Sequence, residues 1–138
     1  MHKFEFLDHT GDMGIRVLGK SLPDLFRHAA EALFHVITDP ETIQSKETRT
    51  ISLQANDLEE LLINWLNEFI YLFDTQGLLF RDFDLLSLNP QSLEATVRGE
   101  SYDESRHPID TIVKSATHHQ LHIRREKGVW KAQIILDL

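Results

Sequence analysis

Alternation of apolar and polar positions predicts strands near the start of the chain. Phe4 and Phe6 fall on one face of a first strand, and the apolar odd positions of residues 13–17 fall on one face of a second. A period of two residues is typical of a strand with one buried face. The segment between them, residues 8–12 (Asp-His-Thr-Gly-Asp), has no apolar residue and is rich in turn formers, so it predicts a loop.

Two segments with apolar residues at spacings of three and four predict amphipathic helices. The first begins after Ser21, a typical N-cap residue, has Pro23 in its first turn and ends before Asp39. The second is capped by Asp57 and closed by Gly77. Each helix carries one apolar stripe, which must be covered by another layer of the fold.

The rest of the chain has the pattern of strands and turns. The expected strand segments are 48–53, 78–83, 93–97, 109–123 and 130–136, with turns at Asn89-Pro90 and Lys127-Gly128. The predicted class is α+β, a two-layer sandwich of a mainly antiparallel sheet with two main amphipathic helices. We expect a single domain spanning residues 1–138, a length at which folding buries a substantial core.

Composition excludes several classes of protein. With 41% hydrophobic and 26% charged residues, the sequence is neither depleted in apolar residues like a disordered chain nor long and apolar enough in any run for a membrane span. The first residues lack the apolar core of a secretory signal, so we expect a cytoplasmic protein. Because there is no cysteine, a bound metal would need oxygen or imidazole ligands.

The charge balance is acidic, with a formal net charge of -8. A uniformly acidic surface repels a phosphate backbone, so strong direct binding of nucleic acid is not expected. One local basic cluster consists of Arg124, Arg125, Lys127 and Lys131. Its two interpretations are a solvated rim of a hairpin and a binding patch, and the sequence favours the rim.

The segment 8–12 is also a candidate for metal binding, because it holds two carboxylates. Asp and Gly are common in ordinary tight turns, so a structural role is an equally good interpretation of the segment alone. Asp137 and Leu138 supply a side-chain carboxylate and a terminal carboxylate at the far end of the sequence. If the last strand lies beside the first, Asp12, Asp137 and Leu138 would form a site for Ca²⁺ or Mg²⁺, which prefer oxygen ligands.

Other polar residues give weaker signals. His118, His119 and His122 resemble a zinc-binding cluster, but on a strand His119 would point away from the other two. Lys114 interrupts an apolar segment and Glu68 lies on the second helix, and each has a surface role as its alternative. The sequence contains neither a nucleophile-elbow motif nor a phosphate-binding loop motif, so no local motif indicates an enzyme.

Five motifs in order along the chain resemble the archease family. They are residues 6–14 (Phe-Leu-Asp-His-Thr-Gly-Asp-Met-Gly), the 22–39 helix ending Val-Ile-Thr-Asp, the 61–73 helix with Trp-Leu-Asn-Glu-Phe at 65–69, the 107–117 segment with Val113-Lys114, and the terminal Ile-Ile-Leu-Asp-Leu at 134–138. The resemblance covers nearly the whole chain. Two positions depart from it, since Gly11 replaces the usual Ala and His118 a common Tyr.

The resemblance implies a fold and a function. The fold is a strand-helix-strand-strand module with an inserted second module. The function is activation of the GTP-dependent RNA-splicing ligase in tRNA splicing and RNA repair, without enzymatic activity of its own, by promoting guanylylation and multiple turnover of the ligase. The family's divalent-metal site falls on Asp12, Asp137 and Leu138, and its other functional residues on Lys114 and Glu68.

Two alternatives to this function remain at this point. One is a chaperone-like binding module for RNA-processing enzymes, including other enzymes that act on tRNA. The other is a metal-dependent hydrolase, which would need a general base that the sequence does not identify.

Overall fold

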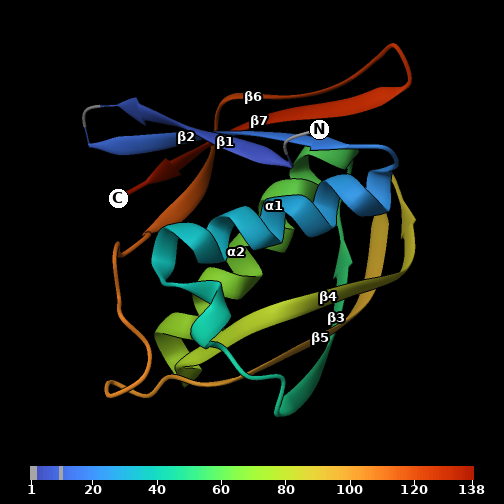
Figure 1. Ribbon diagram of the computed structural model, residues 1–138. Coiled ribbons are helices and arrows are strands. Elements are labelled where there is room, and N and C mark those ends of the chain that lie inside the picture. The colour runs from blue at the N-terminus through green and yellow to red at the C-terminus, as the bar shows by residue number, and fades with distance from the viewer. Residues whose placement is uncertain (1–2, 10) are drawn as a thin grey trace.

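The computed structural model describes residues 3–9 and 11–138, except for the side chains of Asp8 and His9. Seven strands and two long helices make up this part of the chain (Figure 1). Their bounds are β1 Phe4–His9, β2 Asp12–Gly19, α1 Leu22–Ile37, β3 Glu47–Gln54, α2 Leu58–Gln76, β4 Leu78–Asn89, β5 Ser92–Ser101, β6 Ser115–Glu126 and β7 Val129–Asp137, with a short 3-10 helix, η1, at Pro40–Thr42.

The strands form two antiparallel sheets, with the helices between them (Figure 1). The four-stranded sheet has the order β1-β2-β7-β6 and the three-stranded sheet the order β3-β5-β4. The predicted α+β class and the antiparallel pairing are confirmed. The structure adds that the strands divide into two sheets, because β3, β4 and β5 pair only with one another within the described chain.

Two modules with the same order of elements build this arrangement. One consists of β2, α1, β6 and β7, and the other consists of β3, α2, β4 and β5 and is inserted between α1 and β6. In both, the third strand lies between the first and the second. The module organisation implied by the family resemblance is therefore present, with β1 added at one edge of the first module.

The predicted helix ends are confirmed. The Ser21 hydroxyl accepts a hydrogen bond from the Asp24 N–H at 3.2 Å, and the Asp57 carboxylate accepts one from the Glu60 N–H at 2.8 Å. Each cap satisfies one of the backbone donors left free in a first helical turn. Gly77 ends α2 in the left-handed conformation with φ 66°, which a residue without a Cβ adopts at little cost.

Aromatic residues join the two helices and the three-stranded sheet. The Trp65 indole of α2 donates a hydrogen bond to the Phe26 carbonyl of α1 at 2.9 Å. Phe34 and Phe69 from the helices pack against Phe83 of β4.

Neither α1 nor α2 is long and apolar enough to cross a membrane, and the same holds for the other described helix.

Two expected elements differ from the structure. The 109–114 part of the expected strand 109–123 is irregular, and Ile109 makes only an isolated bridge with Thr38. The expected loop at 8–12 is instead a hairpin, since β1 extends through His9 and β2 begins at Asp12. Turn-forming residue types do not exclude strand pairing, because such residues also occur at the paired ends of hairpin strands.

Candidate functional site

The two aspartates expected to bind metal are direct cross-strand partners. β2 begins at Asp12 and β7 ends at Asp137, and the register of the antiparallel pair places them opposite each other. Side chains of such partners lie on the same face, with Cβ atoms about 5 Å apart. Ile15 and Val17 of β2 are buried against the helices, so the alternate residues, including Asp12, lie on the opposite face.

We call this opposite face of the four-stranded sheet, which is turned away from α1 and α2, the outer face. The Asp12 and Asp137 pair forms its acidic end. Leu138 continues from Asp137 along β2, and its N–H lies 3.4 Å from the Gly11 carbonyl oxygen. The structure therefore brings Asp12, Asp137 and Leu138 together at one edge of the molecule.

Gly11 adopts a backbone conformation that favours glycine. Its φ is +77°, and no atom lies within 4 Å of the position where a Cβ would be. Substitution would therefore be strained by the backbone conformation and not by lack of space. Thr10 and the side chains of Asp8 and His9 lie outside the described residues, although the register pairs the backbone of His9 with Asp12.

The donor chemistry of the acidic end suits a hard divalent cation. Like charges placed directly opposite each other on two strands destabilise the pair, and a cation between them would offset that repulsion. Mg²⁺ is commonly held by one or two carboxylates with water completing the shell. No group of three or more His, Asp or Glu side chains is gathered for metal binding in the described part of the chain. A site here would therefore combine Asp12 and Asp137 with the Leu138 carboxylate and water.

Lys114 lies beside the acidic end, but not inside a strand as the sequence predicted. β6 begins one residue later, at Ser115, which pairs with Asp137. The Lys114 N–H donates to the Asp137 carbonyl at 2.8 Å, while the Lys114 side chain is exposed. Its backbone is thus fixed next to Asp137, and its ammonium group is accessible to a partner.

Glu68 is half-buried on α2, and its neighbour Asn67 makes the specific contact. The Asn67 amide donates to the Ala116 carbonyl at 3.1 Å and accepts from the Ala116 N–H at 2.8 Å. These two bonds hold the start of β6, two residues after Lys114. Sequence reasoning missed Asn67, although its position between Ile63 and Ile70 on a buried helical stripe was a signal.

The three histidines do not follow the simple alternation expected of a strand. Gln120 has φ +55°, and the pairing of β6 with β7 shifts register between Thr117 and His122. His118 and His119 are exposed and His122 is half-buried. The premise that His119 points away from the other two by regular alternation is therefore wrong, because a bulge interrupts the strand.

A buried network fixes the segment that leads to Lys114. Glu100 of β5 is only 3% exposed and accepts hydrogen bonds from Arg106, the Gln44 N–H and His107. The His107 Nδ1 accepts from the Asp103 N–H at 2.8 Å, so the proton lies on Nε2, which donates to Glu100 at 2.9 Å. The bonds from Arg106 and His107 to Glu100 tie the 102–108 segment to the three-stranded sheet, and the bond between Asp103 and His107 holds the segment together.

The same network lowers the pKa of Glu100. Burial by itself would raise this pKa, but the hydrogen bonds from Arg106, Gln44 and His107 stabilise the carboxylate more strongly and lower the pKa from 4.5 to about 2. Glu100 is therefore ionised at neutral pH and holds its three donors as an anion.

Comparison with known proteins decides the family. The sequence matches the Archease protein family over residues 4–138. The chain belongs to the archease family. It is 37% identical to the protein archease of Methanosarcina barkeri over 140 residues, covering 99% of this chain and 96% of that one, and 38% identical to that of Methanopyrus kandleri, covering 98% and 99%.

Solved structures of archease-like proteins have the same fold. The solution structure of Methanobacterium thermoautotrophicum protein 1598 superposes with a TM-score of 0.85 at 35% identity, covering all of both chains. The crystal structure of a Thermotoga maritima archease, described as a possible chaperone, gives a TM-score of 0.65 at 20% identity and covers 100% of this chain and 99% of that one. The second likeness concerns the fold alone.

Proposed function

We propose that this archease activates a GTP-dependent RNA-splicing ligase in the cytoplasm and has no enzymatic activity of its own. The observation that carries the proposal is the cross-strand pairing of Asp12 with Asp137, with Lys114 fixed beside them. Membership of the archease family supports the choice of partner, and the acidic charge of the chain suits a basic, RNA-binding ligase.

In this proposal the acidic end holds Ca²⁺ or Mg²⁺ through Asp12, Asp137 and the carboxylate of Leu138. A cation bound there would neutralise negative charge on the phosphates of a nucleotide during guanylylation of the ligase. The protein's own contribution is geometric, because the β2–β7 pairing holds both carboxylates on one face at the edge of the molecule. An edge position lets the site reach into the cleft of a partner.

Lys114 and Glu68 have supporting roles in the proposal. The exposed ammonium group of Lys114 would pair with an acidic group or a phosphate at the ligase site. Glu68 lies on the helix that, through Asn67, fixes the start of β6. We therefore assign Lys114 to contact with the partner and the Glu68 region to positioning.

The test is guanylylation of a cognate ligase by GTP, with and without the archease. We expect stimulation by the wild type and by the control Asp74→Ala, which removes an exposed carboxylate near the C-terminal end of α2. Asp12→Ala should lose most of the stimulation while keeping the wild-type circular dichroism spectrum. Equal stimulation by Asp12→Ala and Asp74→Ala would exclude a role for the acidic end.

A chaperone-like module for RNA-processing enzymes is the second candidate. It is favoured by the description of the Thermotoga maritima relative as a possible chaperone. This function predicts that the protein suppresses aggregation of a tRNA-processing enzyme, and that Asp137→Ala suppresses it equally well. If ligase guanylylation is stimulated at concentrations that leave aggregation unchanged, the chaperone function is not the main one.

A further inference from the structure

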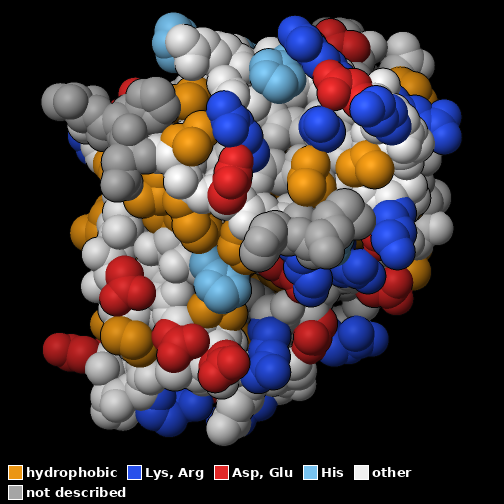
Figure 2. Space-filling view, turned by 45° about the horizontal axis from the view of Figure 1, so that its top comes forward, with side chains coloured by type: hydrophobic (Ala, Val, Ile, Leu, Met, Phe, Trp, Pro, Cys, Tyr) orange, Lys and Arg blue, Asp and Glu red, His pale blue; other side chains and the backbone are white. Residues whose placement is uncertain are grey.

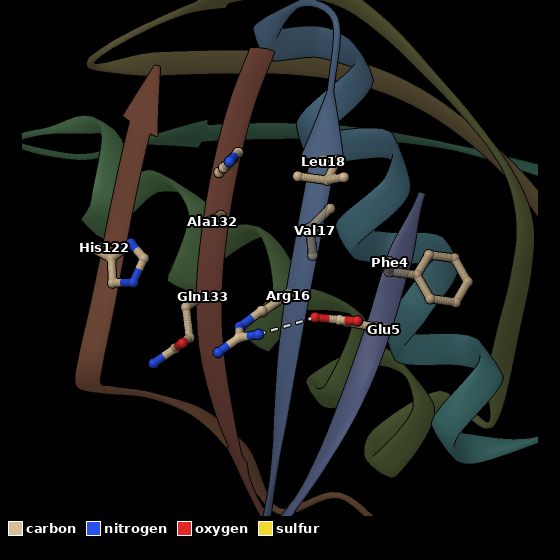
Figure 3. Close-up of a pocket in the computed structure, with 9 residues that line it drawn as sticks. Phe4, Glu5, Arg16, Val17, Leu18, His122, Ala132 and Gln133 are labelled. Carbon is tan, nitrogen blue, oxygen red and sulfur yellow. Dashed lines mark hydrogen bonds and ion pairs between the residues drawn. The ribbon is translucent and has the colours of Figure 1, made fainter. Parts of the chain in front are cut away.

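The outer face of the four-stranded sheet carries a groove at the end opposite Asp12 and Asp137. Neither helix covers this face, which Figure 2 shows from outside the molecule. The groove has a volume of about 560 Å³ and is open to solvent. The side chains that line it on this face come from all four strands (Figure 3) and are Glu5, Arg16, Leu18, His122, Lys131 and Gln133.

The sheet register arranges these side chains in two cross-strand rows. Gln133 of β7 lies between Arg16 of β2 and His122 of β6. One row further along, Lys131 lies between Leu18 and Arg124. We call the second row, with the hairpin that follows it, the basic end of the outer face. Residues in successive rows of one face are about 7 Å apart along a strand, so the two rows present donors in a regular array.

Positive charge is concentrated at this basic end. Residues 122–133 contain four Lys and Arg residues and one acidic residue, Glu126, in a chain whose net charge is -8. Figure 2 shows Lys and Arg side chains gathered toward this side of the face. Arg16 pairs with Glu5 at 3.1 Å and Lys131 with Glu126 at 3.3 Å, but both pairs are exposed, and such pairs contribute little energy. An anionic ligand could therefore displace either acid.

Near the groove, two polar atoms on β6 have no hydrogen-bond partner among the described residues. The His122 Nδ1 and the Thr117 hydroxyl are shielded from solvent and make no hydrogen bond with any described residue. They flank the bulge of β6, and His122 itself lines the groove. Shielded polar groups without a partner cost free energy, which would be recovered if ligand binding moved β6 enough for them to form hydrogen bonds.

We propose that the groove at the basic end binds the phosphodiester backbone of single-stranded RNA. Arg16, Arg124 and Lys131 would contact phosphates, and His122 and Gln133 would donate and accept hydrogen bonds at sugar or base atoms. The choice of RNA over DNA rests on the proposed function, whereas phosphate binding rests on the groove itself. Because only about three cations are engaged in an acidic protein, binding is weak and strongly dependent on salt.

An acidic peptide fits this surface less well than a phosphodiester chain. Extended peptides bind sheets mainly by adding backbone hydrogen bonds to an exposed edge. The cations here lie on the face of the sheet, and the nearby edge at β6 is already bonded to α2 through Asn67 and through Glu59, which accepts from the Ile123 N–H at 3.1 Å. A nucleic-acid backbone needs only side-chain donors, which the two rows supply.

The test is fluorescence anisotropy of a labelled oligouridylate in 50 mM NaCl, measured with the protein alone. We expect binding by the wild type and a loss of about tenfold in affinity for the double variant Arg124→Gln/Lys131→Gln. The control Arg49→Gln/Arg98→Gln removes the same charge from the three-stranded sheet and should bind within about twofold of wild type. The exchange Arg124→Lys/Lys131→Arg keeps the charge and should bind like wild type.

Three results would overturn the proposal. The first is no binding by the wild type in 50 mM NaCl. The second is an equal loss in the two glutamine double variants, which would mean that only net charge matters. The third is displacement of the RNA by an oligoglutamate peptide at a lower concentration than by unlabelled RNA, which would identify an acidic protein as the ligand. None of these results bears on ligase guanylylation, so the proposed function would be tested separately.

Discussion

The acidic end and the basic end lie on the same strands and the same face of one sheet, yet they suit opposite ligands. Asp12 and Leu18 are six residues apart on β2, and Asp137 and Lys131 are six residues apart on β7. At about 3.3 Å per residue, the two ends are separated by roughly 20 Å. That distance is about twice the screening length of physiological salt, so each end acts as a separate electrostatic site.

The difference between the ends shows how little net charge says about local chemistry. Two residues opposite each other in an antiparallel pair share a face, so the register decides which charges meet. The register pairs Asp12 with Asp137 at one end and Lys131 with Arg124 at the other. Like charges are thus paired twice on the outer face, and a ligand of opposite charge would relieve the repulsion in each place.

Removing the carboxylates should have the largest effect, because it deletes the ligands of the acidic end. For Asp12→Asn/Asp137→Asn we expect Mg²⁺ or Ca²⁺ affinity to fall by roughly a hundredfold or more, since loss of even an outer-shell partner can cost that much. Isothermal titration calorimetry measures this affinity. RNA binding at the basic end should be unchanged.

The same variant separates a metal site from an ordinary turn. Without metal, it should melt at the same temperature as the wild type or slightly above it, because a like-charge cross-strand pair has been removed. If Asp12 and Asp137 instead stabilise the hairpin, the variant would melt several degrees lower in the absence of metal. That outcome would contradict the assignment of the acidic end as a ligand site.

Glu100→Gln should have the next largest effect, and it should change ligand binding only at the acidic end. Neutralising this buried carboxylate leaves Arg106 paired only with the exposed Asp103, which should lower the free energy of unfolding by about 2 kcal/mol at pH 7. The 102–114 segment would loosen, so we expect weaker metal binding beside Lys114 and unchanged RNA binding. Urea denaturation measures the stability, with exposed Glu104→Gln as the control.

The effect of Glu100→Gln should depend on pH in a definite direction. Because the folded-state pKa is about 2 and the ordinary value is 4.5, the ionised Glu100 stabilises the fold fully above pH 4.5. This contribution is lost as pH falls from 4.5 toward 2. The stability difference between wild type and variant should therefore shrink over that range, and a constant difference would mean that packing and not charge is responsible.

Raising the salt concentration should lower RNA affinity more than metal affinity, and this difference should be smaller than the effects above. If about three phosphates are contacted, RNA affinity should fall roughly 20-fold between 50 and 200 mM NaCl, as expected for release of counterions from a single strand. Metal affinity at the acidic end should fall less, because ligand bonds to a cation are short and are screened less than exposed charges. Anisotropy and calorimetry in the same buffers give both slopes, and equal slopes would show that the sites are not distinct.

The sequence predicted those parts of the molecule that depend on local signals. The caps at Ser21 and Asp57 and the left-handed Gly77 follow from residue type and spacing, and all three are present. The division into two sheets was not predictable, because alternation says which residues face the core and not which strands pair. For the same reason, the sequence alone could not predict that Asp12 lies opposite Asp137, which depends on the register of β2 and β7.

The predictions for the irregular segments were wrong for a different reason. Residues 109–114 have the composition of a strand, but their position is set by Glu100, His107 and the bridge between Thr38 and Ile109. The bulge at Gln120 likewise has no signal in the residue pattern, and it changes how the histidines lie. Long-range contacts override local preference in both segments.

The smallest expected effect comes from extending the chain beyond Leu138. In the proposed site the carboxylate of Leu138 is a third anionic donor, and a short Gly-Ser extension would convert it into a neutral peptide carbonyl. Metal affinity should fall severalfold, because carbonyl oxygens also bind Ca²⁺ and Mg²⁺ but carry no full charge. The same extension at the N-terminus is the matched control. If calorimetry gives equal affinities for the two extended proteins, Asp12 and Asp137 hold the ion without Leu138, and the acidic end is a two-carboxylate site.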